Sequence, residues 1–196
     1  AASAVAVIAA DAEALPCRAA QFELVLAILV LPWCEPARLF RECARVLRPG
    51  GAFAFSTLGP DSLREIRRAW SAIDDDIHVH PFLDLHDLGD LLLTAGLAEP
   101  VVDAERLTLT YGSPRQLLEE LRAMGTRNAW PTRRRGVTGS GRWRRFEDAL
   151  EASGQGGRWN LSLELVFGHA WGAERRSMPT TAGEHVVPLE RLRRAP

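Results

Sequence analysis

Residues 22–57 read FELVLAILVLPWCEPARLFRECARVLRPGGAFAFST, and this stretch decides the fold class of the chain. Residues 22–31 form an almost unbroken apolar run, typical of a parallel strand that is buried on both faces. Glu35-Pro36 then begins a predicted helix, because a proline in the first turn loses no helical hydrogen bond. After Pro49-Gly50-Gly51 ends the helix, a second apolar strand begins at Ala52. This order predicts a βαβ unit, which requires the two strands to be parallel.

The composition excludes several classes of protein. Of the 196 residues, 46% are hydrophobic and 25% are charged, as in globular domains that fold in water. This length suffices for one α/β domain with a core of its own. The net charge of −1 gives no general attraction to nucleic acid or to membranes. We therefore expect neither of these as a partner.

The cysteines indicate the compartment. Cys17, Cys34 and Cys43 are odd in number and lack the spacing of metal ligands, so a disulfide framework is not expected. The longest apolar run is too short to span a bilayer, and no signal peptide precedes it. The sequence predicts a cytoplasmic protein in a reducing environment.

Further segments extend the predicted sheet and its helices. Residues 4–9 (AVAVIA) are predicted to form another buried strand ahead of the βαβ unit. Residues 159–171 alternate large apolar with small or polar residues, which predicts an antiparallel strand near the sheet edge, paired with 106–111. Helices are expected over 61–73, over 85–95, from Ser113-Pro114 onward, and through Trp143, Phe146 and Leu150.

We predict one domain over residues 1–172, with an inserted helical and basic region at 113–157. Residues 173–196 show no periodicity and are predicted to be a flexible tail. The predicted class is α/β, with a Rossmann-like sheet that is mostly parallel and ends in an antiparallel pair of strands. Ligands of such sheets bind beyond the carboxyl ends of the strands, so the loops at Asp11, 32–34 and 56–59 are expected to line one pocket.

Several landmarks resemble the second half of a class I S-adenosylmethionine-dependent methyltransferase. They are, in order, Asp11-Ala12-Glu13-Ala14-Leu15-Pro16, Phe22-Glu23-Leu24-Val25, Trp33 and Arg45-Val46-Leu47-Arg48-Pro49-Gly50-Gly51. The resemblance implies the class I methyltransferase sheet and S-adenosylmethionine as the cofactor. It also implies that a first strand, a glycine-rich loop and a ribose-binding acidic residue precede residue 1, so that the sheet is expected to be incomplete at the N-terminus.

A narrower resemblance is to the malonyl-[acyl-carrier protein] O-methyltransferases of biotin synthesis. It covers roughly residues 4–172 and rests on Phe55 to Glu65, Ala69-Trp70, His78 to Phe82, Asp87-Leu88-Gly89, Leu107-Thr108-Leu109, Met124 to Asn128, Arg133 to Gly139 and Val166 to Trp171. It implies methylation of the free carboxylate of a malonyl thioester carried by acyl-carrier protein. No catalytic acid or base is expected, because the carboxylate is already ionised and the sulfonium already activated.

The resemblance implies a cofactor site at Asp11, Ala12, Ile28, Leu29 and Trp33. Asp11 would accept a hydrogen bond from the adenine amino group, and the Ala12 N–H would hold a ring nitrogen; alternatively, Asp11 is a solvated loop acid that caps a turn. Trp33 would close the pocket as a flat apolar wall, or pack in the core. Relatives commonly have a polar residue near Ile28, so contacts there would come from backbone groups.

The acceptor side is implied at His80 and Phe82 and at the basic residues Arg133 and Arg134. The loop around His80 would cover the acyl substrate, or serve only as a structural loop. An arginine could pair with the malonyl carboxylate, and the cluster formed with Arg135, Arg142, Arg144 and Arg145 could meet an acidic carrier protein; the alternative is a solvated positive face. No further metal ligands accompany the two histidines, so no metal site is predicted.

Two other functions stay open from the sequence. One is a non-catalytic or assembly-factor-like protein that keeps the methyltransferase fold. The other is a methyltransferase for a different small molecule.

Overall fold

The structure is a computed structural model that describes residues 5–125 and 136–173. The predicted tail therefore lies almost wholly outside the described residues. Ten elements follow in chain order: β1 (Phe22–Ile28), the 3-10 helix η1 (Leu31–Trp33), α1 (Pro36–Val46), β2 (Leu47–Leu58), α2 (Arg64–Ser71), α3 (Leu85–Thr94), β3 (Leu97–Tyr111), α4 (Pro114–Ala123), α5 (Ser140–Ala152) and β4 (Trp159–Gly172).

The sheet has the strand order β1-β2-β4-β3. β1 and β2 are parallel and joined through α1, which confirms the predicted βαβ unit. β4 is antiparallel to both β2 and β3, so the described sheet is mixed, with one parallel pair and two antiparallel pairs. The α/β class is confirmed, and so is the pairing of β4 with β3. β3 forms the edge of the sheet, and β4 lies one strand further in.

The helix ends lie close to the predicted positions, for local chemical reasons. Glu35 caps α1 by accepting hydrogen bonds from the N–H groups of Ala37 and Arg38. Ser113 caps α4 in the same way through the N–H of Gln116. Gly96 follows α3 with φ +85°, a left-handed conformation that glycine adopts at little cost.

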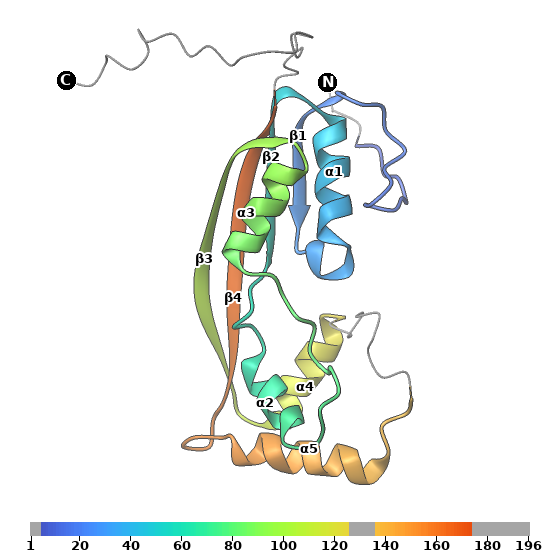
Figure 1. Cartoon of the computed structure of the whole chain (residues 1–196). Coiled ribbons are helices and arrows are strands. Elements are labelled where there is room, and N and C mark those ends of the chain that lie inside the picture. The colour runs from blue at the N-terminus through green and yellow to red at the C-terminus, as the bar shows by residue number, and fades with distance from the viewer. Residues whose placement is uncertain (1–4, 126–135, 174–196) are drawn as a thin grey trace, which may run out of the picture.

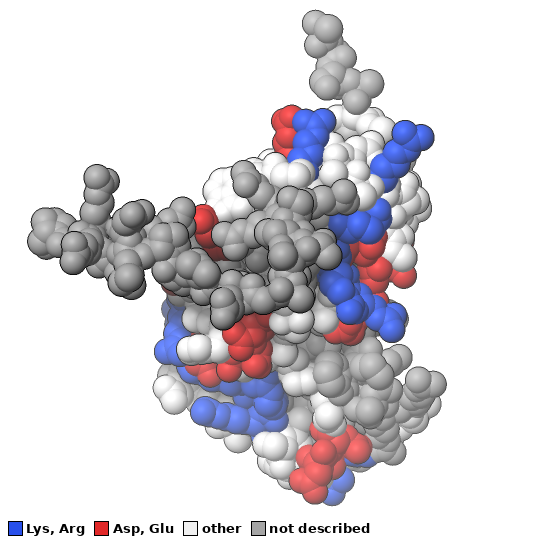
Figure 2. Space-filling view, turned by 45° about the horizontal axis from the view of Figure 1, so that its top comes forward, with Lys and Arg blue, Asp and Glu red and all other residues white. Residues whose placement is uncertain are grey.

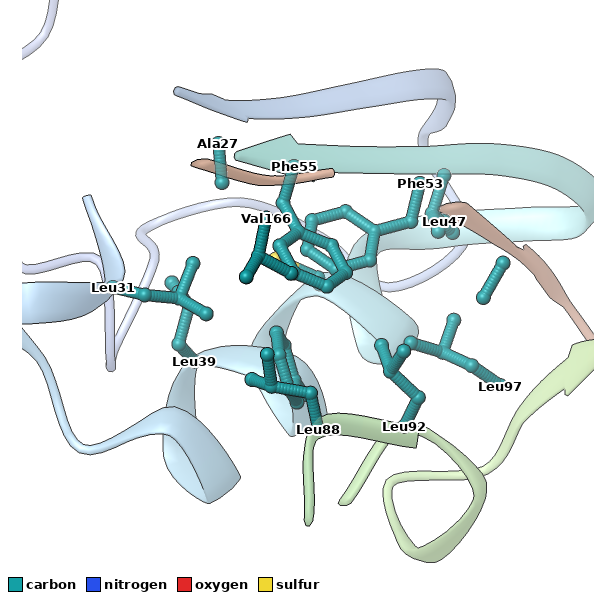
Figure 3. Close-up of a cluster of buried hydrophobic side chains, with 13 residues drawn as sticks. Ala27, Leu31, Leu39, Leu47, Phe53, Phe55, Leu88, Leu92, Leu97 and Val166 are labelled. Carbon is teal, nitrogen blue, oxygen red and sulfur yellow. The ribbon is translucent and has the colours of Figure 1, made fainter. Parts of the chain in front are cut away.

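The main core lies on one face of the sheet, under α1 and α3 (Figures 1 and 3). At its centre the ring of Phe40 from α1 meets the rings of Phe53 and Phe55 from β2, with centroids 5.7 and 5.4 Å away. All three side chains are nearly or fully buried, so they contribute strongly to the hydrophobic stabilisation of the domain.

A second core lies at the end of the sheet where α2, α4 and α5 gather (Figure 1). Trp70 of α2 stacks on Phe146 of α5 with ring centroids 4.3 Å apart. Leu117 of α4 and Leu161 of β4 are fully buried in the same cluster. β4 therefore contributes to both cores.

The prediction that residues 22–31 are buried on both faces is wrong. Leu24, Leu26 and Ile28 are 54%, 60% and 62% exposed, because no described element covers this face of the sheet. Phe167 and Trp171, on the side of β4 with the larger side chains, are likewise exposed. The small residues of β4 face the core instead, because the phenylalanine rings of β2 occupy the space there.

Two further expectations need correction. The described part of the predicted strand 4–9 forms no strand and is exposed, since it pairs with no neighbouring strand. As a result, no third parallel strand lies beside β1 in the described sheet. The turn residues Pro49-Gly50-Gly51 belong to β2, which begins directly after α1 at Leu47. No helix in the described residues is long and apolar enough to cross a membrane.

The close contact at Gly168 gives a first prediction. A Cβ atom there would lie 2.3 Å from the ring of Phe55, so Gly168→Ala is expected to destabilise the fold by about 1–3 kcal/mol through overpacking. Gly89→Ala is the matched control: it lies inside α3 with open space around it and should stabilise the helix by up to about 1 kcal/mol. Urea unfolding measures both changes; equal effects of the two substitutions would contradict the packing described.

Candidate functional site

The carboxyl ends of β1 and β2 lie side by side and are tied together by backbone geometry. Leu29 follows β1 in a left-handed conformation with φ +52°, which is strained for a residue with a side chain. Its N–H donates to the Ser56 carbonyl at 3.0 Å and lies 3.2 Å from the Ser56 hydroxyl oxygen. Ser56 therefore positions the residue at which the chain leaves the sheet.

The acidic loop lies against the start of α1. Glu13 accepts a hydrogen bond from the N–H of Glu35 at 2.6 Å and lies 3.8 Å from Arg38. Burial raises the pKa of the Cys34 thiol, and the nearby carboxylates of Glu13 and Asp11 raise it further. The loop thus reaches the predicted edge of the sheet even though the residues before it form no strand.

The residues predicted to hold the cofactor are available for contact. Asp11 is exposed and accepts from the N–H of Glu13 at 2.9 Å, so it does cap a turn, as the plainer alternative proposed. That bond uses Oδ1 only. Trp33 is 49% exposed, which argues against the alternative that it packs in the core. Ile28 and Leu29, four to five residues before Trp33, also expose apolar side chains.

These side chains are of the kinds that contact a nucleoside. An exposed carboxylate oxygen accepts from an amino group, and exposed apolar side chains flank a flat ring. Ala12 is partly buried against the main core, which fixes the loop that carries its N–H. The Leu29 N–H is already engaged by Ser56, so Leu29 offers its side chain and carbonyl rather than its N–H.

The loop with His80 and Phe82 reaches the same strand ends. Together with Leu31 and Pro32 after β1 and Thr57 and Leu58 of β2, these residues line a hollow of about 20 Å³. The His80 ring lies 5.4 Å from the ring of Phe82, and burial lowers the pKa of His80. The structure therefore brings both residues to the predicted edge.

A larger cleft of about 540 Å³ shares Pro81 and Phe82 with this hollow. We call it the Trp70 cleft; its lining includes Pro60, Arg67, Trp70, His78, Pro81 and Phe82. His78 stacks on Trp70 at 3.7 Å, with an angle of 7° between the rings. His78 thus lines the Trp70 cleft, and His80 lines the hollow at the strand ends.

Arg142 binds two of the aspartates that line the Trp70 cleft. Its guanidinium donates to the carboxylates of Asp74 and Asp76, each at 2.6 Å, and His78 lies 2.8 Å from Asp74. These two aspartates and His78 are close enough together to bind a metal ion, yet both carboxylates already face a guanidinium. Arg142 therefore joins α5 to the loop after α2, which corrects its assignment to a free basic cluster.

The first turn before α2 is held by residues far away in the sequence. The carboxylate of Glu164 accepts from the N–H of Asp61 at 2.9 Å, and Gly59 lies so close to Glu164 that a Cβ there would be 2.5 Å from its carboxylate oxygen. Glu65 of α2 accepts from both the N–H and the hydroxyl of Ser162, at 2.9 and 2.6 Å. α2 is thus attached to β4 at its N-terminal end.

The remaining basic residues do not form one described site. Arg133 and Arg134 lie outside the described residues, and Arg144 and Arg145 are exposed on α5. Figure 2 shows positive and negative side chains interspersed on the face it displays, with no large patch of one sign. No pattern in the sequence indicated the roles of Glu13, Glu65 and Glu164, because these roles depend on partners distant in the sequence.

Comparison with known proteins places these features in context. The profile of the methyltransferase domain family matches residues 1–55. The chain is 43% identical over 167 residues to the malonyl-[acyl-carrier protein] O-methyltransferase of Laribacter hongkongensis, covering 85% of this chain and 56% of the relative. It is 40% identical over 185 residues to the protein of the same name in Nitrosospira multiformis, covering 93% of this chain and 60% of the relative. The chain thus spans less than two thirds of the length of these relatives.

Solved structures share the fold at low sequence identity. A Bacillus halodurans protein assigned as a methyltransferase superposes with a TM-score of 0.56 at 16% identity, over 84% of this chain and 70% of that one. The fold is that of a methyltransferase domain. The YcgJ protein of Bacillus subtilis has a TM-score of 0.55 at 14% identity, again over 84% of this chain and 70% of that one. The resemblance and the methyltransferase fold expected from the sequence are confirmed.

The bond between Glu65 and Ser162 gives a prediction about pH. Burial acts to raise the pKa of Glu65, but the hydrogen bonds from Ser162 and Arg64 outweigh it and hold this pKa below its usual range. A lowered pKa stabilises the fold above the unfolded-state value of about 4.3, and this stabilisation is lost as pH falls through the folded-state pKa. Glu65→Gln should therefore cost about 1 kcal/mol near neutral pH and progressively less in acid.

Urea unfolding of the wild type and Glu65→Gln from about pH 7 to about pH 3 measures this difference, because this range extends below the unfolded-state pKa. Glu147→Gln, an exposed change on α5, is the control and should show no such trend. A difference that stayed constant over this range would contradict the role given to the Glu65 carboxylate.

Proposed function

We propose that this chain is part of an S-adenosylmethionine-dependent O-methyltransferase that methylates the free carboxylate of a malonyl thioester on acyl-carrier protein. The supporting observation is the similarity to two malonyl-[acyl-carrier protein] O-methyltransferases, at 43% and 40% identity over most of the chain. The names of these relatives suggest the substrate, and the resemblance seen in the sequence suggests a place in biotin synthesis. We further propose that the protein acts in the cytoplasm.

The cofactor side of the proposed site lies at the end of β1. Asp11 accepts from the adenine amino group through the oxygen that does not cap the turn, and the Ala12 N–H donates to a ring nitrogen. Trp33, Ile28 and Leu29 form the apolar walls around the nucleoside. Glu13 does not contact the cofactor; it positions this loop through its bond to Glu35.

The acceptor side uses the loop after α2. His80 and Phe82 cover the acyl group at the strand ends, where their hollow adjoins Thr57 and Leu58. We propose Arg133 and Arg134 as contacts to the acceptor or to its carrier protein. The bound sulfonium supplies an activated methyl group. The residues of the chain align the carboxylate with it and exclude water, so no proton has to move in the transfer.

Methyl transfer itself tests the proposed function. The full-length protein that contains this chain is incubated with methyl-labelled S-adenosylmethionine and malonyl-acyl-carrier protein, and the ester is detected on the carrier protein by mass spectrometry. Acetyl-acyl-carrier protein is the control, since it lacks the free carboxylate and should stay unlabelled. A chain that binds S-adenosylhomocysteine but forms no ester would overturn the substrate and favour the non-catalytic alternative or another acceptor.

Asp11→Asn tests the cofactor side. The asparagine keeps one oxygen, which the N–H of Glu13 already uses, so the second acceptor is lost while the turn stays capped. We expect S-adenosylhomocysteine to bind about tenfold more weakly, as for loss of one hydrogen bond to a charged group. Calorimetric titration measures this change, with Asp90→Asn on the exposed side of α3 as the control. Equal affinity in the wild type and Asp11→Asn would remove Asp11 from the site.

A further inference from the structure

Arg67 is a fixed cation in the wall of the Trp70 cleft. Its guanidinium donates to the carbonyl oxygens of Pro60 at 3.1 Å and Ser62 at 3.3 Å. No carboxylate of the described residues forms an ion pair with it. These two bonds orient the guanidinium. Because a guanidinium has five N–H donors, others remain available to bind a ligand.

The Trp70 cleft adjoins the strand ends. Pro60, which accepts from Arg67, follows the last residue of β2 by two positions. Pro81 and Phe82 line both the cleft and the hollow at the ends of β1 and β2. A ligand in the cleft can therefore place one end at the edge where the proposed cofactor site lies.

The lining suits a short acyl group with one negative charge. Trp70, Val79 and Phe82 provide apolar surface. The lining also includes Asp74, Asp75 and Asp76, and Arg142 donates to the carboxylates of Asp74 and Asp76. Arg142 therefore offsets the charge of two of these carboxylates, while Arg67 forms an ion pair with none of them.

We propose that Arg67 binds the free carboxylate of the acceptor and selects it over acceptors without one. This role rests on the proposed function. It assigns binding of the substrate carboxylate to a residue in the described part of the chain. One carboxylate oxygen pairs with the guanidinium, and the other bonds to the methyl carbon as the carbon–sulfur bond breaks. The sulfur keeps the electron pair of that bond, and the carboxylate becomes a neutral ester. Loss of the charge removes the ion pair, so Arg67 favours substrate over product.

Binding of small acceptors tests this without methyl transfer. Malonyl-pantetheine and its methyl ester are titrated into the chain by calorimetry, in the absence of cofactor. The wild type should bind the free acid about tenfold more tightly than the ester, as expected for one charge-assisted contact. Arg67→Gln should abolish this preference, and Arg67→Lys should keep part of it because the charge remains.

Arg68→Gln is the matched control. Arg68 is the next residue of α2, is exposed, and lines a different cavity together with Arg64 and Arg158. Its substitution should leave the preference for the free acid unchanged. Urea unfolding of each variant checks that the loss in Arg67→Gln does not follow from a loss of the fold.

The outcomes separate this inference from the proposed function. A preference for the free acid that survives in folded Arg67→Gln overturns the role of Arg67, and so does a wild type without any preference. If the wild type forms the methyl ester while Arg67→Gln keeps the same KM, the inference fails and the proposed function stands. If the wild type prefers the free acid through Arg67 but forms no ester, the binding site stands and the proposed function fails.

Discussion

The contact between the Phe55 ring and Gly168 sets the geometry of the sheet. β2 is the only described strand that pairs with two partners of different direction, β1 in parallel and β4 antiparallel. Its phenylalanine rings lie on one face, and the ring of Phe55 occupies the space where a side chain at position 168 would be. This packing fixes which side of β4 is buried, because residues of a strand alternate between the two faces. The large side chains Phe167 and Trp171 consequently lie on the open face.

The length of β4 connects the two halves of the site. β4 has 14 residues, and those near its C-terminal end pair with both β2 and β3. Its N-terminal half pairs with β3 only and extends toward α2 and α5. The N-terminal end of α2 is attached to this extension through Glu65 and Ser162. The cofactor edge and the acceptor cleft are thus joined through one continuous strand as well as through the turn after β2. Relative movement of the two regions would break these hydrogen bonds.

The local features of the fold were predictable from the sequence, and so was the pairing of β4 with β3, but the burial of the strand faces and the long-range side-chain contacts were not. The helix at Pro36 and the cap at Ser113 depend on neighbouring residues and were predicted close to where they occur. The run at 22–31 is apolar at nearly every position, and such a pattern does not reveal whether one face or both are covered. The described end of segment 4–9 is also apolar, but a strand forms only where a partner supplies hydrogen bonds.

The same division holds for the site. Asp11, Trp33 and the loop of His80 follow from motifs that are contiguous in sequence, and the structure brings them to the strand ends. Glu65 meets a partner 97 residues away and Glu164 one 103 residues away, so no spacing rule could have found them. Arg142 lay in a basic run that suggested a free charge, and only the fold shows the two aspartates that it binds.

The position of Arg67 depends on this long-range framework rather than on α2 alone. Leu63, directly before α2, has φ +56°, a conformation that costs energy for a side chain of its size. The turn keeps it because Glu164 holds the N–H groups of Gly59 and Asp61, through its carbonyl oxygen and its carboxylate respectively. A helix entered through a relaxed turn would start at a different angle and present a different face to the Trp70 cleft. β4 lies about one hundred residues further along the chain. Its contacts therefore determine that Arg67, rather than Arg68, faces the cleft.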